Sequence, residues 1–185
     1  GEKRIYVTLD ALASAVPPGA NGLFFLPYLI GERSPHWNPK ARGAFVGLTM
    51  SHGRAELSRA VLEGVMFNLR TILAAFRDQG ATFEALRLIG GGARSALWRQ
   101  IAADVFGVPL LLPKLLVEAT ALGAAIAGGV GVGLFTSYGV AGQLVEVVDG
   151  EQPRGQQMAR YDELYDIFVG LYDALTPAYE RIAAL

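Results

Sequence analysis

The residues best suited to chemistry are Gly90 to Ser95, a run of three glycines followed by small and basic residues. They lie within the stretch LRLIGGGARSALWRQIAADVFGV, which covers residues 86–108. Glycines at a turn allow a backbone to approach a bulky ligand closely. A helix is predicted after the turn, and its first N–H groups would be unpaired and would lie at the positive end of the helix dipole. This combination favours the binding of a phosphate group or a nucleotide.

Ordinary packing would also account for these residues. A glycine turn allows a helix to lie close to a strand, Ser95 suits the N-cap of a helix, and Arg94 suits a solvated position. The commonest dinucleotide fingerprint is not met, because Ser95 stands where a glycine or alanine should pack helix on strand. The next strand ends in Pro113 and Lys114 rather than in an acid that would bind a ribose hydroxyl. The residues disfavour a nicotinamide cofactor and leave a phosphate site and a packing turn both open.

A strand–turn–helix–strand unit is expected to hold the glycine turn. Leu86, Leu88 and Ile89 form an apolar run that is typical of a buried parallel strand. Apolar residues then recur at helical spacing over 97–105, and Gly107 marks the end of that helix. The apolar run 108–112 predicts the second strand.

The residues before this unit predict a helix over 6–15, a break at 17–19 and two short strands. The first strand covers 23–30, where Pro27 confines it to a sheet edge or a bulge. The second strand covers 43–48. The loop 31–39 between them (GERSPHWNP) combines charges, a histidine and an indole, so it is either an ordered turn or a contact for a ligand or another domain.

Two long helices are predicted. The first covers 54–79 and ends at Gly80, which is well placed as its C′ residue. Its apolar residues fall on one face: Leu57, Val61, Val65, Leu69, Ile72 and Phe76. The second lies at the end of the chain and carries a core-forming stripe: Tyr161, Leu164, Tyr165, Phe168, Leu171, Tyr172 and Leu175. Pro177 is predicted to end or kink that helix.

The segment 118–133 is dense in alanine and glycine and predicts a short helix capped by Thr120. Its small residues would let this helix lie close to a neighbour or a ligand, although tight packing without function explains most of the alanines. A short strand-like run follows at 144–148.

The composition is that of a globular protein of about one domain. The 185 residues are 52% apolar and 18% charged, which excludes a disordered or collagen-like chain. Sixteen basic and seventeen acidic side chains give a net charge of −1, so no basic footprint for nucleic acid is present. The absence of cysteine excludes disulfides, and a chain with only two histidines disfavours a zinc site. We find no apolar run long enough for a membrane span and no signal peptide, so we expect a cytoplasmic protein without a membrane partner.

Three motifs resemble the C-terminal lobe of the FGGY carbohydrate kinases, a family of the actin, Hsp70 and hexokinase-like superfamily. The segment 43–48 (GAFVGL), with ELSRAVLE at 56–63, resembles the second signature of the family. The segment 88–100 (LIGGGARSALWRQ) is similar to its adenosine motif, and 118–125 (EATALGAA) is similar to the segment that closes its nucleotide cleft.

The resemblance implies an α/β fold of the actin/hexokinase-like (ribonuclease H-like) type, here an incomplete C-terminal lobe with a small sheet flanked by helices. Residues 1–22 would form a leading helix and linker, and residues 23–185 would form the nucleotide-binding domain. The implied activity is transfer of the ATP γ-phosphoryl group, with Mg²⁺, to a sugar hydroxyl. Because LPYLIGERSPH at 26–36 is most similar to xylulokinases, the expected reaction converts D-xylulose to xylulose 5-phosphate. Glycerol, ribulose and gluconate are alternative substrates, and a non-catalytic nucleotide-binding remnant is the alternative function.

The resemblance also implies the site residues. Nucleotide binding would fall on Gly90, Gly91, Gly92, Ala93, Arg94 and Ser95. No residue receives a catalytic or metal-binding role, because the catalytic aspartate of the family lies in its N-terminal lobe, which this chain lacks. Asp10 would not replace it, since it falls on the leading helix. We therefore expect the C-terminal part of a kinase that is inactive alone, that would bind ATP and sugar together with the missing lobe, and that forms a homodimer through an uncovered sheet edge.

Overall fold

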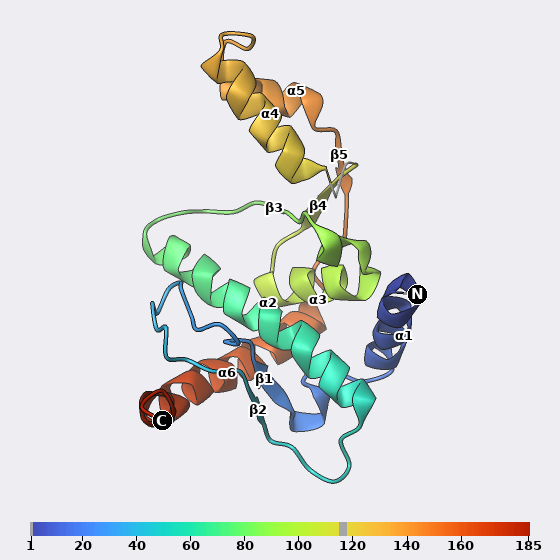
Figure 1. Cartoon of the computed structure of the whole chain (residues 1–185). Helices are drawn as coiled ribbons and strands as arrows, with labels where there is room; N and C mark the ends of the chain where they lie inside the picture. Colours follow the sequence, from blue (N-terminus) through green and yellow to red (C-terminus); the bar gives the residue numbers. More distant parts are fainter. Residues whose placement is uncertain (1, 115–117) are drawn as a thin grey trace. The chain divides into compact units, whose positions relative to one another are not determined.

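The chain forms helices and short strands in the computed structural model, which describes residues 2–114 and 118–185 (Figure 1). The chain divides into two compact units. The first contains Gly1–Thr82, Asp104–Gly107 and Pro153–Leu185, and the second contains Phe83–Ala103 and Val108–Gln152. Small sheets flanked by helices confirm the predicted α/β class. The predicted division of the chain after residue 22 stays a prediction.

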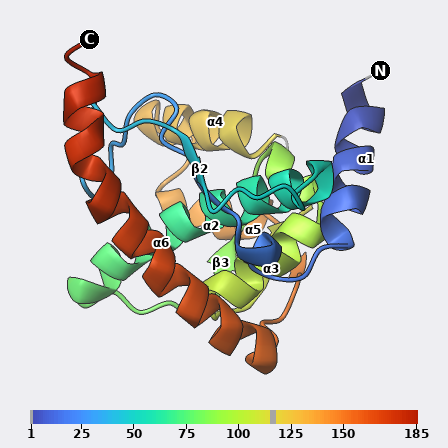
Figure 2. The same cartoon turned by 90° about the horizontal axis from the view of Figure 1, so that it is seen from below.

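In the first unit a two-stranded antiparallel sheet lies against long helices. β1 (Phe24–Leu26) pairs with β2 (Ala44–Val46), and β1 is shorter than predicted because Pro27 has no N–H to continue the pairing. The helix α1 (Glu2–Ser14) and the strand β1 contact α2 (Arg54–Asp78). The C-terminal helix α6 (Gly155–Ile182), drawn in orange to red in Figure 2, contacts both α2 and β1. The 3-10 turn η1 (Ala20–Gly22) precedes β1.

The buried face of α2 differs from its apolar stripe. Leu69 and Phe76 of that stripe are exposed. The buried residues of α2 are Arg59, Ala60, Glu63, Gly64, Met66 and Phe67. Glycine is required at Gly64, because a Cβ there would lie 2.0 Å from the carbonyl oxygen of Phe25. The close approach of β1 and a group of paired charges therefore decide which face of α2 is buried.

That group consists of the Arg59–Glu63 ion pair and the hydroxyl of Tyr161. The Glu63 carboxylate is 2% exposed and accepts hydrogen bonds from Arg59 Nε at 2.6 Å, the Tyr161 hydroxyl at 2.8 Å and the Gly19 N–H at 3.1 Å. Arg59 Nη2 also donates to the Tyr161 oxygen at 2.7 Å. Burial raises the pKa of Glu63, and the charge of Arg59 opposes that rise. The group holds Gly19, whose φ of 89° directs the chain into η1.

Helix α6 confirms the predicted C-terminal helix and its core-forming stripe. The stripe residues that are buried are Tyr161, Leu164, Phe168 and Tyr172. Pro177 does not end the helix, contrary to one of the two predicted outcomes, since α6 continues to Ile182. The Thr176 hydroxyl donates to the Tyr172 carbonyl at 2.9 Å and adds a hydrogen bond in the turn beside the proline.

The second unit contains a three-stranded sheet in the order β3-β4-β5. β3 (Leu86–Arg87) is parallel to β4 (Leu110–Pro113), and β5 (Val147–Asp149) is antiparallel to β4. The expectation that the 86–89 run is buried was wrong, because β3 is an end strand of this sheet and Ile89 is 51% exposed. The 144–148 run contributes only its last residues to β5.

Helices connect these strands. The turn η2 (Gly91–Arg94) and α3 (Ala96–Phe106) follow β3, while α4 (Ala119–Gly131), η3 (Tyr138–Val140) and α5 (Ala141–Leu144) precede β5. Thr120 does not cap α4. The helix begins at Ala119, so Thr120 is already its second residue, and Glu118 holds the N-cap position. None of the helices in the described ranges combines the length and apolar character that crossing a bilayer requires.

Candidate functional site

The six predicted site residues form one continuous turn, Gly90–Ser95, between β3 and α3 of the second unit. The turn is closed by its own backbone. The Ala93 N–H donates to the Gly90 carbonyl at 3.2 Å, and the Ser95 N–H donates to the Gly92 carbonyl at 3.1 Å. The structure therefore brings all six residues together as a single element.

The three glycines of this turn are required for different reasons. Gly90 has a φ of 89° and a ψ of −172°, a backbone conformation that is essentially restricted to glycine. A Cβ at Gly92 would lie 2.2 Å from Cζ3 of Trp98, so the packed indole ring excludes any side chain there. Gly91 has no such neighbour, since, apart from the residues next to it in the chain, no described atom lies within 4 Å of the position that its Cβ would take.

Among the three glycines of the turn, Gly91 is therefore the one that neither packing nor backbone angle explains. Its φ lies outside the left-handed range, so a side chain would be compatible with its backbone. The residue is exposed, and its missing side chain leaves the backbone of the turn open on that side. Such an opening is what a phosphate or a ribose needs to reach backbone N–H groups.

The other three residues of the turn have separate environments. The Ala93 side chain is fully buried, whereas Arg94 is exposed. The Ser95 Oγ accepts a hydrogen bond from the backbone N–H of Trp98 at 3.1 Å, which confirms the N-cap interpretation of Ser95. Nucleotide binding by the six residues stays a prediction.

Arg99, which was not predicted as a site residue, contacts this turn and is paired with Glu151. Arg99 Nε lies 2.8 and 2.9 Å from the two carboxylate oxygens of Glu151, and Arg99 Nη1 donates to the Ala93 carbonyl at 2.8 Å. The helical spacing from Ser95 placed Arg99 on the first turns of α3. Nothing in the local sequence indicated Glu151, which lies 52 positions further along the chain.

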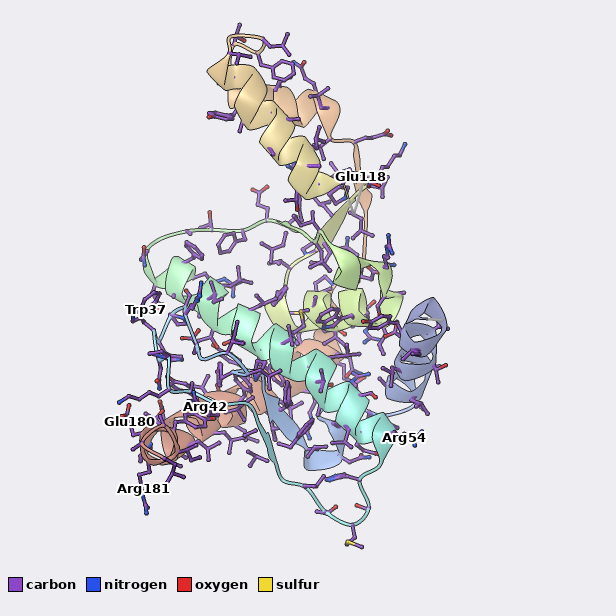
Figure 3. All side chains as sticks on the ribbon, viewed as in Figure 1. Trp37, Arg42, Arg54, Glu118, Glu180 and Arg181 are labelled. Atoms are coloured by element: carbon purple, nitrogen blue, oxygen red, sulfur yellow. The ribbon has the colours of Figure 1, made fainter. Side chains whose placement is uncertain are left out.

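The loop 31–39 of the first unit is an ordered turn. The Glu32 carboxylate is buried and accepts the N–H groups of His36 and Trp37 at 2.9 and 3.0 Å. The His36 ring stacks on Tyr172 with 4.0 Å between ring centroids. The Trp37 side chain is 75% exposed and belongs to this loop (Figure 3). A role for the loop in ligand or domain contacts stays a prediction.

No group of three or more histidine, aspartate or glutamate side chains in the described parts of the chain could hold a metal ion. Asp10 lies in α1, as predicted. A magnesium ion that accompanied ATP would take ligands from the phosphate oxygens.

The chain is similar over most of its length to curated sugar kinases. The gluconokinase of Bacillus licheniformis is 38% identical over 179 residues, which cover 96% of this chain and 35% of that protein. The xylulose kinase of Bacillus subtilis (strain 168) is 36% identical over 160 residues, which cover 85% of this chain and 32% of that protein. The chain thus spans about a third of the length of these relatives.

Solved structures lead to the same group of proteins. The xylulose kinase from Lactobacillus acidophilus matches with a TM-score of 0.84 and 32% identity, over 94% of this chain and 35% of that chain. The gluconate kinase from Lactobacillus acidophilus matches with a TM-score of 0.83, also at 32% identity and over the same shares of the two chains. These matches confirm the predicted fold, the C-terminal lobe of kinases of the actin/hexokinase-like type.

A sequence profile of the C-terminal domain of the FGGY family of carbohydrate kinases matches residues 2–132. The matched range includes β1, β2, α2, the glycine turn and α4. It therefore includes all three motifs that carried the resemblance. The chain belongs to the FGGY family of carbohydrate kinases and carries the C-terminal domain of that family.

Proposed function

We propose that this chain is the nucleotide-binding part of a kinase that transfers the γ-phosphoryl group of ATP to a hydroxyl group of a sugar. Family membership supports the reaction class. The observation that supports the location of the nucleotide is Gly91, where neither backbone angle nor neighbour requires glycine and where the turn is open. Phosphoryl transfer depends mostly on positioning and charge stabilisation, which backbone N–H groups supply.

In this proposal the turn binds the nucleotide through its backbone. The segment 91–93 lies beside the α-phosphate and the ribose, and Gly90 provides the backbone angle that opens the turn. The Ser95 hydroxyl keeps its own hydrogen for an adenine acceptor, because its oxygen is the atom that receives the Trp98 N–H. Bound ATP supplies the transferred phosphoryl group, and Mg²⁺ is held on its phosphate oxygens.

The proposed sugar is D-xylulose, with D-gluconate as the second candidate. The similarity of the 26–36 segment to xylulokinases favours xylulose. Gluconate is favoured by the 38% identity to a gluconokinase, which is close to the 36% identity to a xylulose kinase. The two acceptors differ in charge, since only gluconate carries a carboxylate, so the residues that contact C1 of the sugar would discriminate between them.

We also propose that the protein forms a homodimer and acts in the cytoplasm. β3 is an end strand, and its outer edge has no strand partner among the described residues. An open strand edge favours association with another chain.

The near-neutral net charge of −1 gives no electrostatic basis for binding nucleic acid.

Titration of ADP into the isotope-labelled 185-residue chain tests the nucleotide site. We expect saturable NMR shifts of the backbone amides of residues 90–95. Gly91→Val should abolish these shifts without unfolding the chain, because its side chain would occupy open space rather than clash. Gly170→Val is the matched control, since a Cβ at Gly170 also meets no described atom and lies on the exposed side of α6.

Two outcomes would contradict the proposal. The first is an absence of ADP-dependent shifts in the wild-type chain at millimolar ADP. The second is an unchanged ADP affinity in a folded Gly91→Val variant. Gly92→Val is less informative, because its clash with Trp98 would disturb the turn whether or not a nucleotide binds there.

A further inference from the structure

The side chain of Arg99 connects the glycine turn to the segment that follows β5. Its Nε lies 2.8 and 2.9 Å from the two oxygens of Glu151, and its Nη1 lies 2.8 Å from the Ala93 carbonyl oxygen. Both charged side chains are largely shielded from solvent, with exposed fractions of 18% for Arg99 and 17% for Glu151. Partial burial strengthens charge-assisted hydrogen bonds relative to those on an open surface.

Glu151 is itself held in place. Its carbonyl accepts the N–H of Leu110 in β4 at 3.0 Å. The Gln100 side chain, adjacent to Arg99 in α3, donates to the Gln152 carbonyl at 3.0 Å. The segment 151–152 is therefore attached to both β4 and α3. Glu151 thus has a defined position from which its carboxylate can orient the guanidinium.

Arg99 contacts the turn through the backbone carbonyl of Ala93. The carbonyls of Gly90 and Gly92 are used within the turn by the N–H groups of Ala93 and Ser95. Arg99 binds the next carbonyl, that of the fully buried Ala93. The backbone on either side of Gly91 is thus held by bonds inside the turn and by one bond from α3. The open side of Gly91 is left free.

We infer that Arg99, oriented by Glu151, is a positioning residue that holds the 90–95 turn in the shape that receives the nucleotide. The inference rests on the proposed function, because it assumes that this turn binds ATP. Arg99 would not touch the nucleotide; it acts through the Ala93 carbonyl. Lysine could not replace it, because an ammonium group lacks the planar fork that reaches the carboxylate and the carbonyl together.

The test compares ADP affinity and local amide exchange in four forms of the chain: wild type, Arg99→Lys, Glu151→Gln and the double variant. We expect Arg99→Lys to raise the ADP dissociation constant about tenfold, the effect of losing one charge-assisted hydrogen bond. Glu151→Gln should act in the same direction. The double variant should bind ADP no more weakly than Arg99→Lys alone, because the two residues act as one unit. Arg160→Lys is the control, since Arg160 pairs with Glu163 at an exposed site in α6.

Amide exchange separates positioning from general stability. In Arg99→Lys the amides of Ala93 and Ser95 should exchange faster, while the urea midpoint of the chain changes little. An unchanged ADP affinity in both single variants, alongside normal wild-type binding, would overturn this inference and leave the proposed function intact. Absence of ADP binding by the wild-type chain would instead contradict the proposed function, and this inference would fall with it.

Discussion

At the scale of single residues, Glu63 joins three segments of the first unit. Its carboxylate accepts hydrogen bonds from α2, from α6 and from the linker at Gly19. A buried carboxylate is costly unless its charge is paired and its oxygens are bonded, and both conditions are met here. Glu63 therefore contributes to stability because Arg59 pairs its charge and Tyr161 and Gly19 donate hydrogen bonds to its oxygens.

Removing that carboxylate should destabilise the chain strongly. We expect Glu63→Ala to lower the free energy of unfolding by about 3–5 kcal/mol, because the buried Arg59 would lose its counter-charge. Tyr161→Phe should cost about 1–3 kcal/mol, since it removes a hydroxyl and leaves the ion pair in place. Urea denaturation followed by circular dichroism measures both variants. A Glu63→Ala loss below about 1 kcal/mol would show that water or another anion takes the place of the carboxylate beside Arg59.

The glycine turn shows the same dependence on neighbours. Gly90, Gly91 and Gly92 are identical in sequence but differ in backbone angle and in surroundings. A substitution at each would therefore have a different physical effect: strain at Gly90, occupied space at Gly91 and a clash with Trp98 at Gly92. Only the substitution at Gly91 examines ligand access without disturbing the turn.

At the scale of elements, the first turn of α2 is stabilised by Glu56. Its carboxylate accepts the Gly53 N–H at 2.9 Å, as in a capping box. This hydrogen bond is the main cause that lowers the pKa of Glu56 below its ordinary value of 4.5. Because the folded-state pKa is lowered, the stabilising contribution is present above pH 4.5 and is lost as the pH falls through the folded-state value.

Glu56→Ala should therefore lower the melting temperature at pH 7. The difference between wild type and variant should shrink as the pH falls below 4.5, where the carboxylate of the unfolded chain is protonated. Thermal melts at several pH values between 7 and 3 measure this difference. Asp166→Ala, at an exposed position within α6, controls for the general effect of removing a negative charge. A difference that is constant across this pH range would rule out the capping carboxylate as its source.

At the scale of the whole molecule, the chain spans about a third of the length of its relatives. By the family resemblance, the catalytic aspartate lies in the other lobe. General-base catalysis of the kind that this aspartate supplies is worth about 10²- to 10⁴-fold. We therefore expect the 185-residue polypeptide alone to show no ATP-dependent phosphorylation of D-xylulose, D-gluconate or glycerol.

A coupled assay of ADP release measures this activity, with the xylulose kinase of Bacillus subtilis as the positive control. Sugar-dependent turnover at about 1–100 s⁻¹, the usual range for kinases, would contradict the expectation. ADP binding without turnover would agree with part of a kinase.

The sequence by itself determined the kinds and order of most elements and the family. The helix from Arg54 to Asp78 and the φ of 88° at Gly80 follow from local patterns, as does the core-forming stripe of α6. These features depend on hydrogen bonds and side-chain spacing within a few residues, so a short window of sequence contains them. The family was predictable because its motifs occur together in one order.

Only the tertiary structure decided which face of α2 is buried, why each glycine of the turn is a glycine, and which residue orients Arg99. The apolar spacing of α2 did not show that Gly64 must admit the Phe25 backbone or that Glu63 finds its partner in Tyr161, 98 positions away. Glu151 lies 52 positions from Arg99. Packing and charge pairing act between residues that are neighbours in space. These residues lie far apart in the sequence and become neighbours only when the chain folds.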